Sequence, residues 1–524
     1  MHLRSDTLTN RQVVSALLKF LEQVGILGRG GWVEQNPEHW YDAFCLTVQQ
    51  VLRSSGTAAE QITAVGIVGV THNCVLLDDR DQPLRPVVTM VDTRSRPQVQ
   101  AILERWGDEV FQRTRNDPST IWSWPQLMWI REHQRDLWAR VRRVRFAKDY
   151  VRHRLAPSMV TDSIDAAGTL LFDPRANRWI GPFCSDLGLR EDCLPEVVSP
   201  LDVVGKLNRQ GAADTGLAEG TPVVAGTTDT AAEVLGAGAL RPGMATVKLA
   251  SVGRIAVVAT TPLMRHRTIN YRHVLPELWY PGTASKYAAS ALRWLRDVLF
   301  PGTQDEGVFV ARDRQAATVP PGAEGLLFHP HLMGQWAPHW NDHLRGNFLG
   351  LTARHGQSHP IRTVLEGVAF ALRDALEELE GAGLCADEIR LIGQGSQSEL
   401  WCQIVTDVLG RPVCVPRQTD AAFGAALIAA AGAGMIEPAS ASVERLIGLR
   451  AQLMPDARCG ERYRQLFDIY RSADGLTAAL SERLGAFEQQ GKDWGLEEKG
   501  DGPHLCEAPF GPFRQMGTVP FFRP

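Results

Sequence analysis

The sequence lacks the cysteine patterns of metal sites and disulfide frameworks. Its nine cysteines include no Cys-x-x-Cys pair, and they are odd in number and scattered along the chain. We therefore expect reduced thiols in a cytoplasmic protein.

Long hydrophobic segments and an excess of one charge are also missing. The longest apolar run, residues 421–436, is mostly alanine and glycine and is too short to span a bilayer. Arg4, Asp6 and Arg11 precede any apolar run, which is not the layout of a signal peptide. The net charge is only −4, from 55 Lys and Arg against 59 Asp and Glu. We therefore expect neither nucleic acid nor a membrane as a partner.

What the chain does have is the length and pattern of a multidomain α/β protein. Its 524 residues are too many for one hydrophobic core, and strand-like and helix-like segments alternate. The pattern predicts strands at residues 62–70, 75–77, 222–225 and 389–392, and a hairpin at 245–258. It predicts helices at residues 12–27, 98–105, 125–140, 287–300, 361–379 and 399–409.

Two junctions between a strand and a helix carry functional signals. The strand at 389–392 is followed by the loop Gly393-Gln394-Gly395-Ser396 and then by a helix. Free backbone N–H groups and the positive end of a helix dipole suit a phosphate, although glycine turns are common in α/β proteins. The strand at 222–225 leads into Asp229, which is either a plain N-cap or a functional carboxylate.

Taken together, these segments resemble the FGGY family of carbohydrate kinases, and most of all its xylulokinases. The resemblance runs from Gly31 to about Leu484. The matching motifs are Gly31-Trp32-Val33-Glu34-Gln35, Gly69-Val70-Thr71-His72-Asn73, Asp92-Thr93-Arg94, Lys148-Asp149-Tyr150, Thr161-Asp162, Leu170-Leu171-Phe172-Asp173, Ala225-Gly226-Thr227-Thr228-Asp229, Gly325-Leu326-Leu327-Phe328, Arg345-Gly346, Glu366-Gly367-Val368-Ala369 and Gly393-Gln394-Gly395-Ser396.

The resemblance implies two actin/hexokinase-like (ribonuclease H-like) domains around a central cleft. Residues 1–247 would form the sugar-binding domain and residues 248–490 the ATP-binding domain. Residues 491–524 are rich in Gly, Pro and charge, and we expect a disordered tail there.

The resemblance also implies roles for residues that could otherwise be structural. Asp229 would be the general base that accepts the proton of the sugar hydroxyl during phosphoryl transfer. His72, Thr71, Trp129 and Thr230 would contact the sugar, although a lone His is usually structural and Trp129 could simply pack a helix. Asp92 is either a sugar contact or a structural residue.

ATP and Mg²⁺ are the implied cofactors. The resemblance implies that ATP is bound by Ser251, Gly253, Gly393, Gly395, Ser396 and Gly424. For Gly424 the alternative is close packing of an alanine-rich helix.

Several departures from the family affect the phosphate side. Where the family opens with Asp-x-Gly-Thr, this chain has Asp6-Thr7-Leu8-Thr9, followed by the predicted helix 12–27 in place of a β-hairpin. A leucine in place of glycine would obstruct the approach of backbone to phosphate. The second phosphate turn, Gly-Thr-Ser-Gly in the family, is Ala250-Ser251-Val252-Gly253 here. Gln126 and Gln335-Trp336 replace the family's Lys and Glu-Arg.

Three functions therefore stay open. The first is ATP-dependent phosphorylation of a sugar, with D-xylulose to D-xylulose 5-phosphate favoured. The second is an FGGY kinase for another polyol or sugar acid, and the third is an impaired kinase relative that binds sugar. The expected partners are the sugar and ATP, and a homodimer is also left open.

Overall fold

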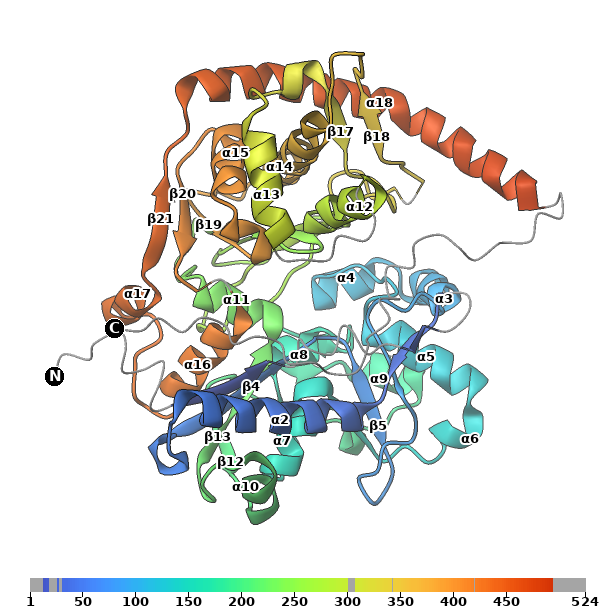
Figure 1. Cartoon of the computed structure of the whole chain (residues 1–524). Helices are drawn as coiled ribbons and strands as arrows, with labels where there is room; N and C mark the ends of the chain where they lie inside the picture. Colours follow the sequence, from blue (N-terminus) through green and yellow to red (C-terminus); the bar gives the residue numbers. More distant parts are fainter. Residues whose placement is uncertain are drawn as a thin grey trace.

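A computed structural model shows two α/β halves, with helices α11 and α16 between their sheets (Figure 1). It describes residues 13–17, 26–27, 31–299, 307–341, 343–418 and 420–492. The motif remnants Asp6, Leu8 and Thr9 lie outside the described residues, as does the expected tail from residue 493 onward. Within the described part, no helix is both long and apolar enough to cross a membrane.

The first half is built on a four-stranded sheet in the order β1-β4-β13-β12. Strands β1 (Val13–Leu17), β4 (Ala64–Gly69) and β13 (Pro222–Thr228) are parallel, and β12 (Val203–Lys206) is antiparallel to β13.

The predicted helix at residues 12–27 is wrong. Its first part is β1, which pairs in register with β4 from Val13 with Ala64 to Leu17 with Val68. Its end is β2 (Ile26–Leu27), which pairs with β3 (Val33–Gln35). Without β1, the buried strand β4 would have a row of unpaired backbone groups, so tertiary pairing overrides the helical spacing of the apolar residues.

Helices cover both faces of this first sheet. Val65 and Ile67 of β4 pack in one core with Trp40 of α2 (Pro37–Ser55) and Val151 of α7 (Ala147–Leu155). The residue between them, Gly66, faces the opposite side, where α16 (Ala421–Gly432) crosses. Sequence from the far end of the chain therefore completes the core of the first half.

The second half is built on a six-stranded sheet in the order β16-β15-β14-β19-β20-β21. Its strands are β14 (Met244–Leu249), β15 (Gly253–Val257), β16 (Gly282–Ser285), β19 (Glu388–Ile392), β20 (Val413–Pro416) and β21 (Leu449–Leu453). The division expected between residues 247 and 248 falls within β14. We propose that the domains divide near this strand, with α16 returning to the first half.

The predicted helical face of residues 361–379 is confirmed in α14 (Ser358–Gly381), where Val364, Leu365, Val368, Leu372 and Leu376 are all buried. The other helices of the second half are α12 (Ala289–Leu299), α13 (Gly307–Ala317), α15 (Glu399–Leu409) and α18 (Ala457–Lys492), whereas α17 (Ala441–Ile447) packs in one core with α11 and α16. The predicted hairpin at residues 245–258 is confirmed as β14 and β15.

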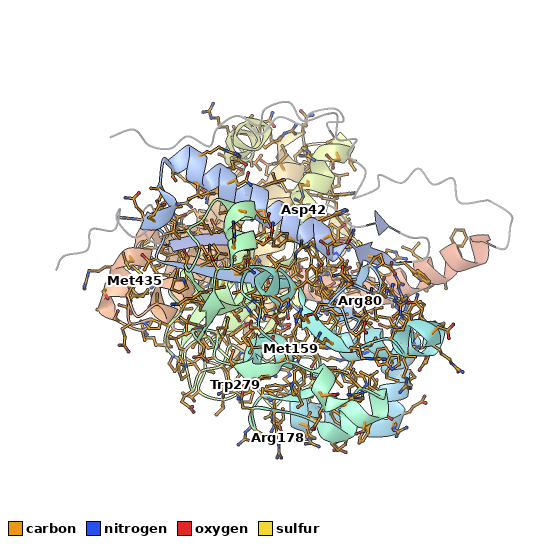
Figure 2. All side chains as sticks on the ribbon, turned by 90° about the horizontal axis from the view of Figure 1, so that it is seen from below. Asp42, Arg80, Met159, Arg178, Trp279 and Met435 are labelled. Carbon is orange, nitrogen blue, oxygen red and sulfur yellow. The ribbon has the colours of Figure 1, made fainter. Side chains whose placement is uncertain are left out.

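The remaining elements lie mostly in the first half. They are η2 (Ala59–Gln61), β5 (Cys74–Leu77), β6 (Val87–Val88), α3 (Arg96–Trp106), α4 (Asp108–Thr114), α5 (Ser123–His133), α6 (Arg135–Trp138), β7 (Arg143–Phe146), β8 (Val160–Asp162), α8 (Ser163–Ala167), β9 (Phe172–Asp173), β10 (Arg178–Trp179), α9 (Gly181–Leu187), η3 (Glu191–Cys193), β11 (Glu196–Val198), α10 (Arg209–Thr215), α11 (Asp229–Gly236), η4 (Ala323–Gly325), β17 (Leu327–His329), β18 (Asn347–Leu349) and η5 (Gln394–Gln397). Seen from below, side chains spread over the first half from Met435, just beyond α16, to Arg178 of β10 (Figure 2).

Candidate active site

Asp229 is the first residue of α11, directly after β13. The N-cap is Thr228, whose hydroxyl accepts the Ala231 N–H at 3.3 Å. Asp229 Oδ1 accepts hydrogen bonds from the Thr230 N–H at 2.6 Å and the Thr230 hydroxyl at 3.2 Å. The plain N-cap interpretation of Asp229 is therefore wrong, and its carboxylate stands in the first turn, where the helix dipole favours negative charge.

His72 follows β4 in a left-handed backbone conformation, with φ of 71°, and its side chain is buried. Its Nδ1 lies 2.7 Å from the carbonyl oxygen of Gly168, so Nδ1 carries the proton. Its Nε2 accepts from the hydroxyl of Tyr271 at 2.8 Å. Burial lowers the pKa of His72 to about 4, so the imidazole is neutral near pH 7.

Tyr271, the residue that bonds to His72, belongs to the second half of the chain. It lies in the connection between β15 and β16, which has no regular hydrophobic pattern and therefore gave no signal in the sequence. The neighbouring Asn270 fastens this connection to the first half: its N–H donates to Asn116 Oδ1 at 2.8 Å, and its amide donates to the Arg115 carbonyl at 2.7 Å.

Arg254 of β15 is a second residue that the sequence did not single out. Its guanidinium carbon lies 5.5 Å from the ring centre of Tyr271 and 5.8 Å from that of Tyr280. Its Nε and one terminal nitrogen are buried without a hydrogen-bond partner. Burial raises the pKa of Tyr271, Arg254 lowers it, and Asp229 raises it. These effects place Arg254, Asp229 and the His72–Tyr271 pair in one neighbourhood.

A buried ionic network braces the strand that carries Asp229. Lys148 Nζ lies 2.5 Å from an oxygen of Asp149, 3.0 Å from Asp162 and 3.4 Å from Asp165. Asp162 in turn accepts from the Thr227 hydroxyl at 2.9 Å, two residues before Asp229. Although burial alone would lower it, the three carboxylates hold the pKa of Lys148 above its ordinary value.

Of the other predicted sugar contacts, Thr71 and Thr230 adjoin this neighbourhood. Thr71 is buried and its hydroxyl has no hydrogen-bond partner, so it could bind a ligand hydroxyl. Thr230 donates to Asp229, as described above. No described contact joins Trp129 or Asp92 to this group.

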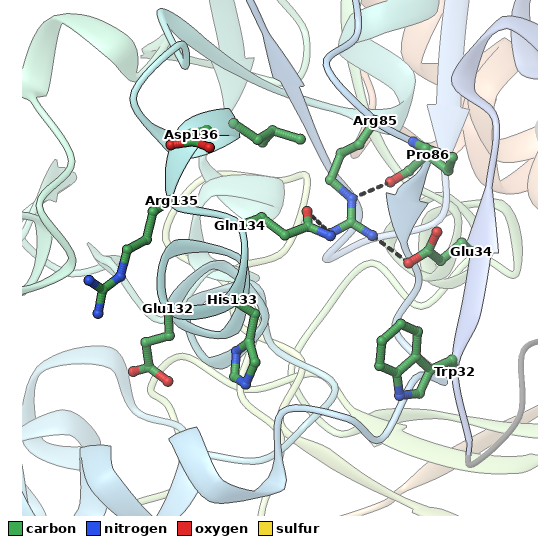
Figure 3. Close-up of a pocket in the computed structure, with 10 residues that line it drawn as sticks. Trp32, Glu34, Arg85, Pro86, Glu132, His133, Gln134, Arg135 and Asp136 are labelled. Carbon is green, nitrogen blue, oxygen red and sulfur yellow. Dashed lines mark hydrogen bonds and ion pairs between the residues drawn. The ribbon is translucent and has the colours of Figure 1, made fainter.

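Trp129 stacks on His133 at 4.5 Å and meets the edge of Trp32 at 5.2 Å. A pocket of about 760 Å³ opens beside them, lined by Trp32, Glu34, Arg85, Pro86, Glu132, His133, Gln134, Arg135, Asp136 and Leu137 (Figure 3). At its centre Arg85 donates to Gln134 at 2.8 Å and to the Pro86 carbonyl at 2.9 Å, and pairs with Glu34.

Asp92 is not among the residues that line this pocket, and both of its oxygens accept hydrogen bonds. Its Oδ2 accepts from the Val33 N–H and from the Arg94 guanidinium, both at 2.6 Å. Its Oδ1 accepts from the Arg94 N–H at 2.9 Å. These contacts favour the structural alternative for Asp92.

On the phosphate side, the loop after β19 packs tightly against β14. Gly393 has φ of 87°, and a Cβ there would lie 2.7 Å from the Leu249 carbonyl oxygen. A Cβ on Gly395 would lie 2.7 Å from the Leu249 side chain. The Ser396 hydroxyl donates to the Gly393 carbonyl at 2.7 Å, and Arg450 donates to Gln397 at 2.7 Å. The glycines thus serve close packing, while Arg450 supplies positive charge that suits a phosphate.

The turn from Ala250 to Gly253 is bound to the start of α12. Ala289 N–H donates to the Ala250 carbonyl at 2.7 Å, and the Ser290 hydroxyl donates to the Ser251 carbonyl at 2.6 Å. Arg293 donates to the Ser251 hydroxyl, which gives this turn a guanidinium too. A Cβ on Gly253 would lie 2.9 Å from the Leu372 side chain.

Gly424 is explained by helix packing. A Cβ there would lie 1.8 Å from the Ala232 carbonyl oxygen, because α16 crosses α11 at this point. The packing alternative is therefore the one that its contacts support.

Known proteins match this chain over most of its length. Residues 13–236 match the N-terminal domain, and residues 256–433 the C-terminal domain, of the FGGY family of carbohydrate kinases. The xylulose kinase of Bacillus subtilis is 30% identical over 467 residues, covering 88% of this chain and 92% of that protein. The gluconokinase of the same organism is 27% identical, covering 83% and 86%. The crystal structure of xylulose kinase from Rhodospirillum rubrum superimposes with a TM-score of 0.77 at 26% identity, covering 88% and 93%.

Proposed function

We propose that this chain, which belongs to the FGGY family of carbohydrate kinases, phosphorylates D-xylulose to D-xylulose 5-phosphate with ATP. The xylulose kinases among its relatives support this substrate. The observation that carries the proposal is the position of Asp229: it begins α11 without being its N-cap, near the His72–Tyr271 pair.

In the proposed reaction, Asp229 orients the attacking sugar hydroxyl and accepts its proton as the new O–P bond forms. Thr230 holds the carboxylate through two hydrogen bonds to Oδ1. The network around Lys148 fixes the end of β13, so that the carboxylate keeps its place. His72 stays neutral, and Thr71 offers its hydroxyl to the sugar.

Kinases of this family use ATP with a metal ion, and we propose Mg²⁺ as that ion. Bound Mg²⁺–ATP would supply the phosphoryl group and neutralise its charge. The residues that fit the phosphates lie in two turns, each with a guanidinium: Ser251 and Gly253 with Arg293, and Gly393 to Ser396 with Arg450. Asp229 is a carboxylate that could also bind the cation.

A second candidate is a kinase for a sugar acid, and Arg254 favours it. Arg254 is half-buried, and its two buried nitrogens without a hydrogen-bond partner are costly unless an anion satisfies them. The carboxylate of an aldonic or ketonic acid would do so beside Asp229. The gluconokinase among the relatives supports the same alternative.

The experiment that tests the proposal is a panel of ketoses, polyols and sugar acids assayed for ADP release with ATP and Mg²⁺. D-xylulose should give the largest kcat/KM. A larger value for a sugar acid would favour the second candidate, and no turnover with any sugar would contradict a kinase function.

A further inference from the structure

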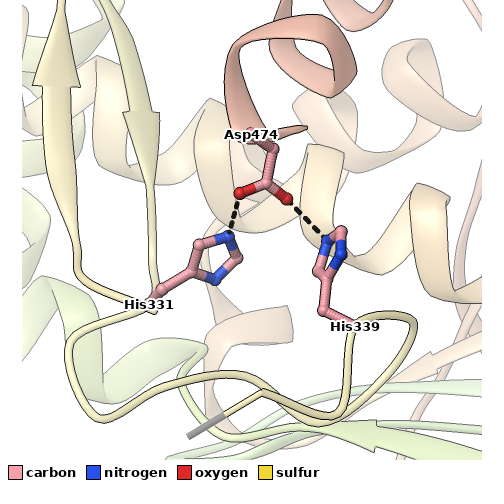
Figure 4. Close-up of side chains that lie close together, drawn as sticks. All are labelled: His331, His339 and Asp474. Carbon is pink, nitrogen blue, oxygen red and sulfur yellow. Dashed lines mark hydrogen bonds and ion pairs between the residues drawn. The ribbon is translucent and has the colours of Figure 1, made fainter. Parts of the chain in front are cut away.

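A cluster of two histidines and an aspartate lies in the second half, independent of the proposed kinase function. His331 follows β17, His339 lies in the loop between β17 and β18, and Asp474 lies on α18 (Figure 4). His331 Nε2 is 3.0 Å from Asp474 Oδ1, and His339 Nε2 is 2.6 Å from Asp474 Oδ2. Each residue offers one ligand atom, an imidazole nitrogen or a carboxylate oxygen, and these three atoms all lie within 4.8 Å of one another.

The cluster is largely shielded from water. The side chains of His331 and Asp474 are each 2% exposed, and that of His339 is 32% exposed. A second buried carboxylate, Asp374 of α14, has an oxygen 3.7 Å from His339 Nε2. Three of the four groups are therefore buried, and His339 is the one that solvent reaches.

The charges around the cluster leave Asp474 without a permanent positive partner. Arg471 contacts Asp374 at 3.1 Å and Glu377 at 3.3 Å. Among the described residues, no lysine or arginine forms an ion pair with Asp474. A buried carboxylate in this position needs either a protonated imidazole or a metal cation.

The spacing of the ligand atoms suits a small tetrahedral cation. With metal–ligand distances of about 2.0–2.1 Å, tetrahedral ligand atoms are about 3.4 Å apart. The separations of 2.6 and 3.0 Å between Asp474 and the two histidines are somewhat shorter, so these atoms would move apart by less than about 1 Å on binding the ion. Two imidazole nitrogens with carboxylate oxygens are donors typical of Zn²⁺, whereas Mg²⁺ and Ca²⁺ prefer oxygen ligands alone.

We propose that His331, His339 and Asp474 bind a structural Zn²⁺ ion, with the fourth position taken by water on the exposed side of His339. The ion joins α18 to the loop between β17 and β18. Gln335 of the same loop accepts from the Ser285 hydroxyl and the Lys286 N–H, both at 3.2 Å. Lys286 lies just before α12, which binds the turn at Ala250, so the ion would steady the loop beside a proposed phosphate turn.

The test measures zinc bound to the full chain without a histidine tag. Protein saturated with zinc sulfate and passed through gel filtration should carry one zinc per chain by plasma mass spectrometry. The double variant His331→Gln with Asp474→Asn should carry none. The control His266→Gln, a histidine that contacts Asp117 in the first half, should still carry one.

A second measurement keeps the proposal testable if the double variant folds poorly. Co²⁺ added to the metal-free wild-type protein should give the intense visible absorption of a four-coordinate site, and equimolar Zn²⁺ should abolish it. Zinc should also raise the melting temperature of the wild-type protein. A wild-type chain that retains no zinc and gives no such spectrum, or a folded double variant that retains one zinc, contradicts the proposal.

Discussion

The hydroxyl of Tyr271 lies 2.8 Å from Nε2 of His72, although 199 residues separate them in the sequence. This bond joins the connection between β15 and β16 to the loop after β4, so it links the two halves at the proposed active site. Because Nε2 of His72 already accepts from Tyr271, a sugar hydroxyl can donate to this nitrogen only alongside the Tyr271 hydroxyl or in its place.

Tyr271→Phe should destabilise the protein. The change leaves Nε2 of the buried His72 without a donor, which costs about 1–3 kcal/mol. The free energy of unfolding, measured in urea, checks this. The control is Tyr470→Phe, since that buried hydroxyl has no hydrogen-bond partner and its loss should change stability little. Equal effects of the two variants would mean that the His72–Tyr271 bond contributes nothing.

Stability should fall as the pH drops from about 6.5 toward 4. The folded protein lowers the pKa of His72 to about 4, so the unfolded chain binds the proton more readily in this window. Stability is therefore present above the unfolded pKa and is lost as the pH falls, by up to about 3 kcal/mol for this group. Urea unfolding at several pH values should show a smaller slope for His72→Gln than for the wild type. An unchanged slope would show that His72 is accessible to protons when folded.

Arg254→Gln separates the two substrate candidates. If Arg254 binds a substrate carboxylate, the variant should lose roughly 10- to 100-fold in kcat/KM for a sugar acid, the value of a charge-assisted hydrogen bond. The kcat/KM for neutral D-xylulose should change far less. A wild-type protein that phosphorylates no sugar acid would remove the second candidate.

Variants of the turn at Ala250 test whether the phosphate-binding part of the proposed active site is impaired. Restoring the family residues with Ala250→Gly and Ser251→Thr should raise turnover, by up to roughly 10², because backbone N–H groups could then approach the phosphates more closely. The single variant Ser251→Thr is the control, since it leaves the alanine in place. A double variant no faster than the wild type would show that this turn is not limiting, and the impaired-kinase alternative would lose its support here.

Much of the fold could be predicted from the sequence, because the periodic elements carry their own signal. The buried face of α14 and the β14–β15 hairpin follow from apolar spacing alone. Strand β1 could not be predicted in this way, because its apolar residues also fit a helix and only pairing with β4 decides between them. A cytoplasmic location and a homodimer stay predictions.

The site was predicted less completely, for a related reason. Asp229 and His72 stand at the ends of strands, where function is expected. Tyr271 and Arg254 reach them only through folding of the second half onto the first, which no local pattern reveals. The pocket beside Trp129 and the packing of Gly424 likewise depend on contacts between distant segments.

The turnover of Asp229→Asn on D-xylulose with ATP tests the central claim most directly. The substitution keeps the size of the side chain but removes the proton acceptor, so kcat should fall roughly 10²–10⁴-fold while sugar binding and melting temperature change little. Asp192→Asn, at an aspartate 62% exposed on the surface, should keep the wild-type rate. A folded Asp229→Asn protein that retains most of its turnover would contradict the claim that Asp229 is the general base of a sugar kinase.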